Sequence, residues 1–247
     1  MLKICGLKKT YTPSSSEVLK GINLTINQGE FVVIIGSSGS GKTTLIRCIN
    51  RLITATEGEI FFQGQQINNL SGSKLRRFRT QIGMIFQDYN LIGRSNVMQN
   101  VLHGRLGQMN IIKSALGLYS KDDLQEAYKL LVAVGLEEFM HKKASTLSGG
   151  QMQRVGICRA MMQKPKLLLA DEPISSLDPT SASIVLDQIS ALTKARGLTS
   201  IINLHQVDFA QKYASRIIGL KAGEIVYDGT PSNLDTATIN HIYGSNT

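Results

Sequence analysis

One stretch near the N-terminus has the residue types and spacing needed to hold a chain of phosphates. Residues 36–43 read GSSGSGKT and fit the pattern G-x-x-x-x-G-K-[ST]. Glycines let the backbone turn its N–H groups toward phosphate oxygens, and a helix that follows adds its positive N-terminal end. In such a loop the lysine reaches the β- and γ-phosphates, and the last hydroxyl ligates Mg²⁺. The predicted nucleotide-binding residues here are Gly36, Ser37, Ser38, Gly39, Ser40, Gly41, Lys42, Thr43 and Thr44.

Two adjacent carboxylates end an apolar run later in the chain. Residues 167–172 read LLLADE, so Asp171 and Glu172 close a strand that is buried on both faces. A phosphate-binding loop needs a carboxylate that holds Mg²⁺ through its water shell, and Asp171 fits this role. Glu172, one residue on, is suited to orient or deprotonate an attacking water. An Asp-Glu pair alone is often only a solvated strand end, but the loop at 36–43 favours the catalytic interpretation.

A second glycine-containing helix start lies between these two motifs. Residues 147–151 read LSGGQ, and Ser148 with its two glycines would open a helix whose backbone N–H groups face phosphate. A lone S-G-G is ordinarily a helix cap and a turn. The complete pentapeptide, in this position along the chain, favours a phosphate-binding role.

Strands and helices alternate around these motifs, which predicts an α/β fold with a mostly parallel sheet. The expected strands are Leu2–Tyr11, Val18–Ile26, Phe31–Ile35, 58–64, 82–87, Leu167–Ala170 and Ser200–Leu204, with a hairpin of Arg216–Lys221 and Glu224–Asp228. A turn is expected at Pro13–Ser16. Helical periodicity follows the loop over 42–52, and Asp178-Pro179 is a good start for a helix that Gly197 ends.

Strand signals are weak from about Asp88 to Met162, and we expect a helical insertion there. Within it, residues 122–134 place five apolar side chains on one helical face: Leu124, Ala127, Leu130, Leu131 and Val134.

The composition limits the partners that this chain can have. The net charge is +9, and the densest basic cluster is Lys74, Arg76, Arg77 and Arg79. Tryptophan is absent and stacking aromatics do not interleave with these cations, so we expect a solvated face or a surface near lipid headgroups, and no nucleic acid. No run approaches the roughly 20 apolar residues of a membrane span, and the N-terminus lacks a signal peptide, which favours the cytoplasm. Three cysteines without metal-ligand spacing are expected to be free and buried.

The order of the motifs resembles that of the ATP-binding subunits of ABC transporters. The matching residues are Gly36–Thr43, Gln87, Leu147–Gln151, Asp171-Glu172, Ser176-Leu177-Asp178 and His205. The resemblance implies an ATP hydrolase with a P-loop NTPase (RecA-like) core, an antiparallel β subdomain and an inserted α-helical subdomain. The single domain, 1–247, would divide into a core of 1–87 and 163–247 and a helical part of 88–162 that carries the signature motif.

The resemblance also implies a dimer in which two copies face head to tail. ATP and Mg²⁺ on the loop of one copy would be covered by Ser148, Gly149, Gly150 and Gln151 of the other. Gln87 would lie near Mg²⁺ and the attacking water, and His205 would contact the γ-phosphate. Tyr11 stands where the family places an aromatic side chain that stacks on adenine. Taken alone, Tyr11 is more often a packed strand residue, and a lone His205 is more often structural.

Two longer stretches, 82–107 and 202–229, resemble the PhnC-like ATPases of phosphonate importers. That resemblance implies transmembrane permease subunits, a periplasmic or lipid-tethered solute-binding protein, and a peripheral place on the cytoplasmic face of the inner membrane. The solute, whether phosphonate, phosphite, hypophosphite or phosphate, is left open.

Three other kinds of ABC ATPase share the nucleotide motifs. One is an ABC-like accessory subunit of a soluble C–P lyase complex, and another is an importer of amino acids or methionine. A DNA-repair or translation ATPase would carry a long coiled coil or tandem cassettes, for which 247 residues leave no room. The short stretch after 234–244 likewise leaves no room for a regulatory domain, so we expect no inhibition through one.

Overall fold

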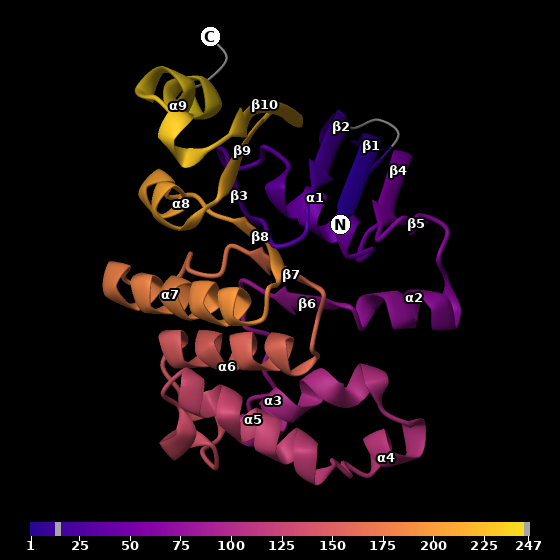
Figure 1. Cartoon of the computed structure of the whole chain (residues 1–247), viewed down its shortest axis with the longest axis vertical. Coiled ribbons are helices and arrows are strands. Elements are labelled where there is room, and N and C mark those ends of the chain that lie inside the picture. The colour runs from indigo at the N-terminus through magenta and orange to yellow at the C-terminus, as the bar shows by residue number, and fades with distance from the viewer. Residues whose placement is uncertain (13–15, 245–247) are drawn as a thin grey trace.

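The computed structural model describes residues 1–12 and 16–244, so most of the turn expected at Pro13–Ser16 lies outside it. Its strands are β1 (Leu2–Lys9), β2 (Leu19–Ile26), β3 (Phe31–Ile35), β4 (Glu57–Phe62), β5 (Gln65–Gln66), β6 (Ile82–Ile85), β7 (Leu167–Asp171), β8 (Thr199–Asn203), β9 (Arg216–Lys221) and β10 (Glu224–Gly229). In this part of the chain they form a four-stranded sheet, β2-β1-β4-β5, and a six-stranded sheet, β10-β9-β3-β8-β7-β6 (Figure 1).

The larger sheet is mostly parallel, as the sequence predicts. Strands β9, β3, β8, β7 and β6 run parallel, and β10 is antiparallel to β9. Every residue of β3, β7 and β8 is buried, because the sheet is covered on both faces. Within β3, Val33 and Ile35 pack into one apolar core while Val32 and Ile34 pack into the other. The carboxyl ends of these parallel strands therefore meet at one edge, where ligands of such sheets bind.

The α-helices cover the larger sheet, and those of segment 88–162 form one end of the molecule. They are α1 (Lys42–Ile49), α2 (Gly72–Arg79), α3 (Val97–Leu102), α4 (Ile111–Ala115), α5 (Lys121–Ala133), α6 (Gly149–Met162), α7 (Pro179–Ala195), α8 (Val207–Tyr213) and α9 (Thr236–Tyr243). Four short 3₁₀ helices in the same described residues are η1 (His103–Gln108), η2 (Glu137–Phe139), η3 (Ala144–Thr146) and η4 (Pro231–Asn233). Helix α7 begins as expected, because the Asp178 side chain accepts hydrogen bonds from the N–H groups of Thr180 and Ser181.

Segment 88–162 is helical and lies at the end of the molecule away from α9 (Figure 1). Its last helix, α6, contacts α3 and α5 on one side and α7 and β6 on the other. Helix α5 buries Ala127, Leu130 and Leu131, but Leu124 is 43% exposed. The predicted helix forms, and Leu124 of its expected apolar face lies in the first turn of α5, where its side chain stays exposed.

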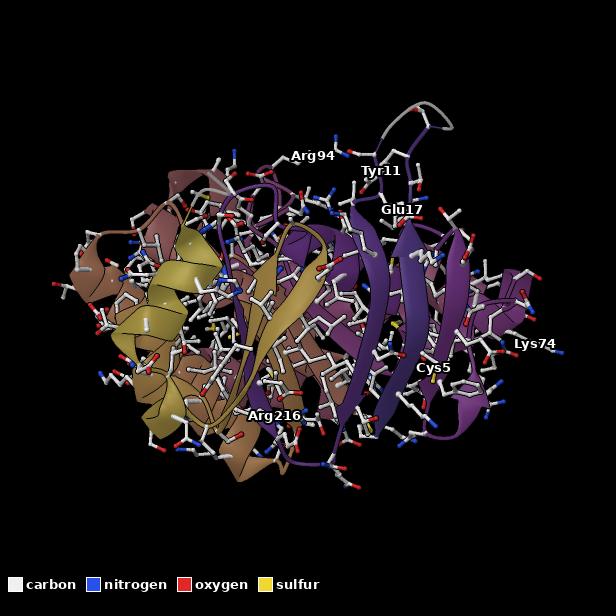
Figure 2. The ribbon with its side chains drawn as sticks, turned by 90° about the horizontal axis from the view of Figure 1, so that it is seen from above. Cys5, Tyr11, Glu17, Lys74, Arg94 and Arg216 are labelled. Atoms are coloured by element: carbon white, nitrogen blue, oxygen red, sulfur yellow. The ribbon has the colours of Figure 1, made fainter. Side chains whose placement is uncertain are left out.

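The basic cluster lies on α2, and only part of it is solvated. Lys74, Arg76 and Arg77 are exposed, and Lys74 points outward at the edge of the molecule (Figure 2). Arg79 turns inward instead and donates to the Arg51 carbonyl at 2.5 Å. Among the described residues, no helix combines the length and the apolar composition of a membrane span.

The three cysteines are unpaired, as expected, although not all are buried. Cys48 and Cys158 are buried, whereas Cys5 is partly exposed. Cys5 departs from the expectation because burial alternates along the start of β1, so Cys5 shares the outer face of the strand with the exposed Lys3.

Arg216 joins the two sheets at the end of the molecule opposite Tyr11 (Figure 2). Its guanidinium binds both carboxylate oxygens of Asp228, at 2.6 and 2.7 Å, and donates to the Thr25 carbonyl of β2 at 2.9 Å. It also forms an ion pair with Glu30 at 3.2 Å. This fork connects β2 with β9 and β10 and so fixes the small sheet beside the strand that leads into residues 36–43.

Candidate functional site

Residues 36–43, called the nucleotide loop from here on, connect β3 to α1 around a cavity of about 200 Å³. The loop lies so close to its neighbours that glycine is required at two positions. A Cβ atom on Gly36 would lie 2.1 Å from the Leu220 carbonyl oxygen, and one on Gly41 would lie 2.9 Å from that of Val18. Gly41 also has a φ of +105° at the start of α1, a conformation that favours glycine. The cavity is lined by Val18, Ser38, Gly39, Ser40, Gly41, Lys42, Thr43, Thr44 and Glu172.

Lys42 places a buried cation inside the nucleotide loop. Its side chain donates to the carbonyls of Gly36 at 2.8 Å and Ser37 at 2.9 Å, and the residue is only 4% exposed. Burial lowers the pKa of the Lys42 ammonium, while the carboxylates of Glu172 and Asp171 act to raise it. The loop is therefore already closed around its lysine, whose charge faces the two carboxylates.

Asp171 lies at the centre of a polar cluster where β7 and β8 end. Its Oδ1 atom accepts hydrogen bonds from the Thr43 hydroxyl at 2.8 Å and from the Asn203 amide at 2.9 Å. Parallel pairing places Asp171 directly beside Asn203, and Arg47 lies 3.9 Å from Oδ2. The Thr43 hydroxyl and the Asp171 carboxylate provide oxygen atoms of the kind that Mg²⁺ prefers, so the chemistry of this pair fits that ion, with Asp171 acting through its water shell.

Sequence reasoning did not identify Asn203 as a site residue. Asn203 is fully buried and contacts the carboxylate predicted to hold Mg²⁺. The signal that could have revealed it is a lone amide in the apolar strand 200–204, two residues before His205.

Glu172 and His205 form the other close pair of the site. His205 Nε2 lies 2.7 Å from Glu172 Oε1, and the Glu172 side chain is only 16% exposed. Glu172 adopts a φ of +50°, a left-handed conformation that costs a non-glycine residue about 1 kcal/mol or more. This backbone turns its carboxylate away from the strand direction and toward the cavity, which it lines.

Two further predicted residues lie at the margin of the site. The Tyr11 hydroxyl is 3.2 Å from the Thr44 hydroxyl, and Tyr11 is 53% exposed beyond β1 (Figure 2). Gln87 is exposed just after β6, and parallel pairing of Ile85 with Ala170 brings it toward the end of β7. The described residues provide no hydrogen bond from Gln87 to Asp171 or Glu172, so proximity alone associates it with the site.

Residues 148–151, called the signature segment from here on, begin α6 and lie outside the cavity. Ser148 accepts from the Gln151 N–H at 3.3 Å, and the Gln151 side chain accepts from the Ser148 N–H at 2.9 Å. This reciprocal capping box satisfies two N–H groups of the first turn. Gly149 and Gly150 follow Ser148, and none of the four residues lines the cavity of the nucleotide loop. Within one chain, the structure therefore does not bring the signature segment to the nucleotide loop.

Tyr89 connects the segment after Gln87 with two other motifs, and sequence reasoning missed it. Its hydroxyl is 2.9 Å from the Ser176 hydroxyl, and a Cβ atom on Gly149 would lie 2.9 Å from the same oxygen. Tyr89 has a φ of +57°, and its carbonyl accepts from the Arg159 guanidinium of α6 at 2.7 Å. A left-handed tyrosine held in this way is visible only in the fold.

Comparison with known proteins agrees with this arrangement. The ABC transporter family profile matches residues 19–175. The chain is 52% identical over 243 residues to "Phosphonates import ATP-binding protein PhnC 2" of Halalkalibacterium halodurans, with 98% of this chain and 99% of that protein covered. It is 51% identical over 235 residues to "Phosphonates import ATP-binding protein PhnC" of Treponema denticola, with 95% and 91% covered.

Solved structures of ATP-binding cassettes have a similar fold. A dimeric post-hydrolysis state of the cassette MJ0796, bound to ADP and Pi, matches with a TM-score of 0.81 and 34% identity, covering 94% of this chain and 99% of that one. The ADP conformation of the cassette MJ1267 matches with a TM-score of 0.85 and 28% identity, covering 99% of both chains.

Proposed function

The chain belongs to the ABC transporter family, and we propose that it hydrolyses ATP to drive the import of phosphonate, or of a related phosphorus oxyanion. Phosphonate as the cargo is supported by identities of about one half, over nearly the whole chain, to two phosphonate import proteins. For the hydrolysis itself, the observation that carries the proposal is the Glu172–His205 pair at 2.7 Å, beside the Thr43–Asp171 pair at 2.8 Å.

Each residue of the site has a chemical task in this proposal. Lys42 and the backbone N–H groups of the nucleotide loop bind the β- and γ-phosphates. Thr43, Asp171 and Gln87 would hold Mg²⁺, and the ion would neutralise part of the phosphate charge. Asn203 occupies one lone pair of Asp171 and so fixes the direction of that carboxylate. Tyr11 provides an exposed ring for adenine, and its hydroxyl lies near Thr44 at the edge of the loop.

Hydrolysis then requires a water aligned with the γ-phosphorus. Glu172 accepts a proton from this water as its oxygen attacks the γ-phosphorus, the bond to the β-phosphate oxygen breaks, and ADP departs. His205 orients Glu172 through their short contact, and we expect its imidazole to reach the γ-phosphate as well. Most of the rate enhancement comes from alignment and from the fixed charges that surround the transferred group.

The signature segment completes the site from a second copy of the chain. In one chain its capped helix start lies outside the cavity, so its free N–H groups are available to phosphates bound elsewhere. A head-to-tail dimer would place Ser148, Gly149, Gly150 and Gln151 on the ATP of the partner. The dimeric form of the cassette MJ0796 supports this arrangement. The proposal further includes permease subunits, an external solute-binding protein, and a peripheral place on the cytoplasmic side of the membrane.

Glu172→Gln tests the proposed hydrolysis. The amide keeps the shape of the side chain but cannot accept a proton, so ATP binding should persist while turnover falls by about three orders of magnitude. Phosphate release and titration with a fluorescent ATP analogue measure the two quantities. Glu138→Gln, an exposed carboxylate of η2 in the helical segment and outside the cavity, is the matched control and should behave as wild type. Wild-type hydrolysis by the Glu172 variant would refute the assignment of the base.

The cargo is tested separately on the complete transporter. Reconstituted with its permease and solute-binding protein in proteoliposomes, the chain should support ATP-dependent uptake of a labelled phosphonate. Phosphite and phosphate are offered under the same conditions. Uptake of neither phosphonate nor phosphite would refute this cargo class while leaving the ATPase proposal intact.

A further inference from the structure

Helix α9 packs against β9 and β10, and β9 is the neighbour of the strand β3 that leads into the nucleotide loop, although α9 falls outside the matched family segment 19–175. Its Ile242 is fully buried, and a Cβ atom on Gly219 would lie only 2.6 Å from Ile242 Cδ1. Gly219 of β9 pairs with Ile35, the residue before Gly36. Glycine at 219 therefore lets the last turn of α9 approach β9 at the point where the nucleotide loop begins.

Because α9 approaches β9 so closely, the side chain of Tyr243, the residue after Ile242, reaches the backbone of His205. The Tyr243 hydroxyl donates a hydrogen bond to the His205 carbonyl at 2.9 Å. Burial raises the pKa of Tyr243, while the Gly36 backbone amide acts to lower it. The Tyr243 hydroxyl thus connects the residue that faces Glu172 to a helix packed on Gly219, which pairs with the residue before the nucleotide loop.

The backbone of His205 depends on few other constraints. Leu204 donates to the Ile34 carbonyl at 3.0 Å, which fixes the chain one residue earlier. The following helix, α8, begins at Val207, and the side chain of the preceding Gln206 does not cap it. A shift of the His205 backbone by a fraction of an ångström would displace its imidazole from Glu172, because the two side chains meet at 2.7 Å.

We propose that Tyr243 is a positioning residue for ATP hydrolysis, because it fixes the His205 backbone against the start of the nucleotide loop and so aligns the imidazole with Glu172. This inference rests on the proposed hydrolysis at the same site. It assigns the C-terminal helix a part in catalysis: α9 holds one side of the site, although it contributes no side chain to the cavity.

Tyr243→Phe in the full-length chain is the direct test. Loss of one hydrogen bond should lower kcat about three- to tenfold while leaving KM and the affinity for ATP unchanged. In a His205→Ala background the same change should have no further effect, because the imidazole that Tyr243 aligns is gone.

Tyr227→Phe is the matched control. Tyr227 also donates its hydroxyl to a backbone carbonyl, that of Thr230 at 2.6 Å, but it does so away from the site. This variant should hydrolyse ATP at the wild-type rate. Ile242→Val controls for stability, because it loosens the same helix without removing the phenol.

Three outcomes would overturn the inference. They are a wild-type kcat for Tyr243→Phe, a loss no larger than that of Ile242→Val at an equal fall in melting temperature, and an undiminished effect in the His205→Ala background. Each of them leaves the proposed hydrolysis intact if wild type turns over and Glu172→Gln does not. An inactive wild-type chain would instead refute the function itself.

Discussion

The nucleotide loop and the signature segment both begin a helix with glycines and a small hydroxyl residue, yet they are built in opposite ways. The loop is held by its own hydrogen bonds: Lys42 donates to two carbonyls across it, and Thr43 contacts Asp171 at the end of β7. In the signature segment, by contrast, Ser148 and Gln151 form their hydrogen bonds with each other, in a capping box. A loop that is hydrogen bonded to its own sheet can bind a ligand within one chain. A helix start that lies away from that loop can meet the same ligand only from a second copy of the chain.

The largest effect expected from this difference is the loss of ATP binding in Lys42→Ala. The change removes the cation that meets the phosphates and also leaves the Gly36 and Ser37 carbonyls without their donor. Affinity for a fluorescent ATP analogue should fall about 100-fold, the effect of losing two charge-assisted hydrogen bonds. Lys74→Ala removes an equal charge from the exposed face of α2 and should bind as wild type. Equal affinity of both variants would contradict the view that the loop binds nucleotide by itself.

A somewhat smaller but more specific effect is expected when two damaged chains are mixed. Ser148→Arg should bind ATP normally yet hydrolyse poorly, because it blocks the surface offered to a partner. Combined with Lys42→Ala at equal amounts, it should restore about a quarter of the wild-type rate if the two sites act independently, since half of the dimers keep one intact site.

The mixture distinguishes a composite site from a self-contained one. Each variant alone provides the baseline, and phosphate release is the measurement. If the mixed rate equals the mean of the two separate rates, the signature segment does not act on the partner. The different construction of the two regions would then not reflect a site shared between two copies.

The same contrast explains how far the sequence could predict this molecule. The strands 31–35 and 167–171, the start of α7 and the loop 36–43 follow from local patterns, because buried strands and caps are dictated by neighbours in sequence. The contacts of Asp171 with Thr43 and Asn203 were only partly predictable, since they depend on which strands become neighbours.

Contacts between distant motifs could not be predicted from local patterns at all. The contact of Tyr243 with His205 joins residues on α9 and after β8, and only the close approach of Ile242 to Gly219 brings them together. Tyr89 likewise acquires its partners from α6 and from residue 176. Such residues have ordinary sequence surroundings, and their roles arise from packing.

The smallest expected effect concerns Tyr89, which contacts the signature segment and the turn between β7 and α7. Its hydroxyl lies 2.9 Å from that of Ser176 and packs against Gly149 at the start of the signature segment, so it couples that segment to the turn that follows Glu172. Tyr89→Phe removes a single neutral hydrogen bond and should lower the ATPase rate about two- to fivefold, with ATP affinity unchanged. Ser176→Ala should have the same effect, and the double variant should be no worse than either, because both changes remove one shared interaction. Steady-state rates of the four proteins complete this cycle. Additive losses would mean that the two hydroxyls act separately, and the signature segment would then be uncoupled from the turn that follows Glu172.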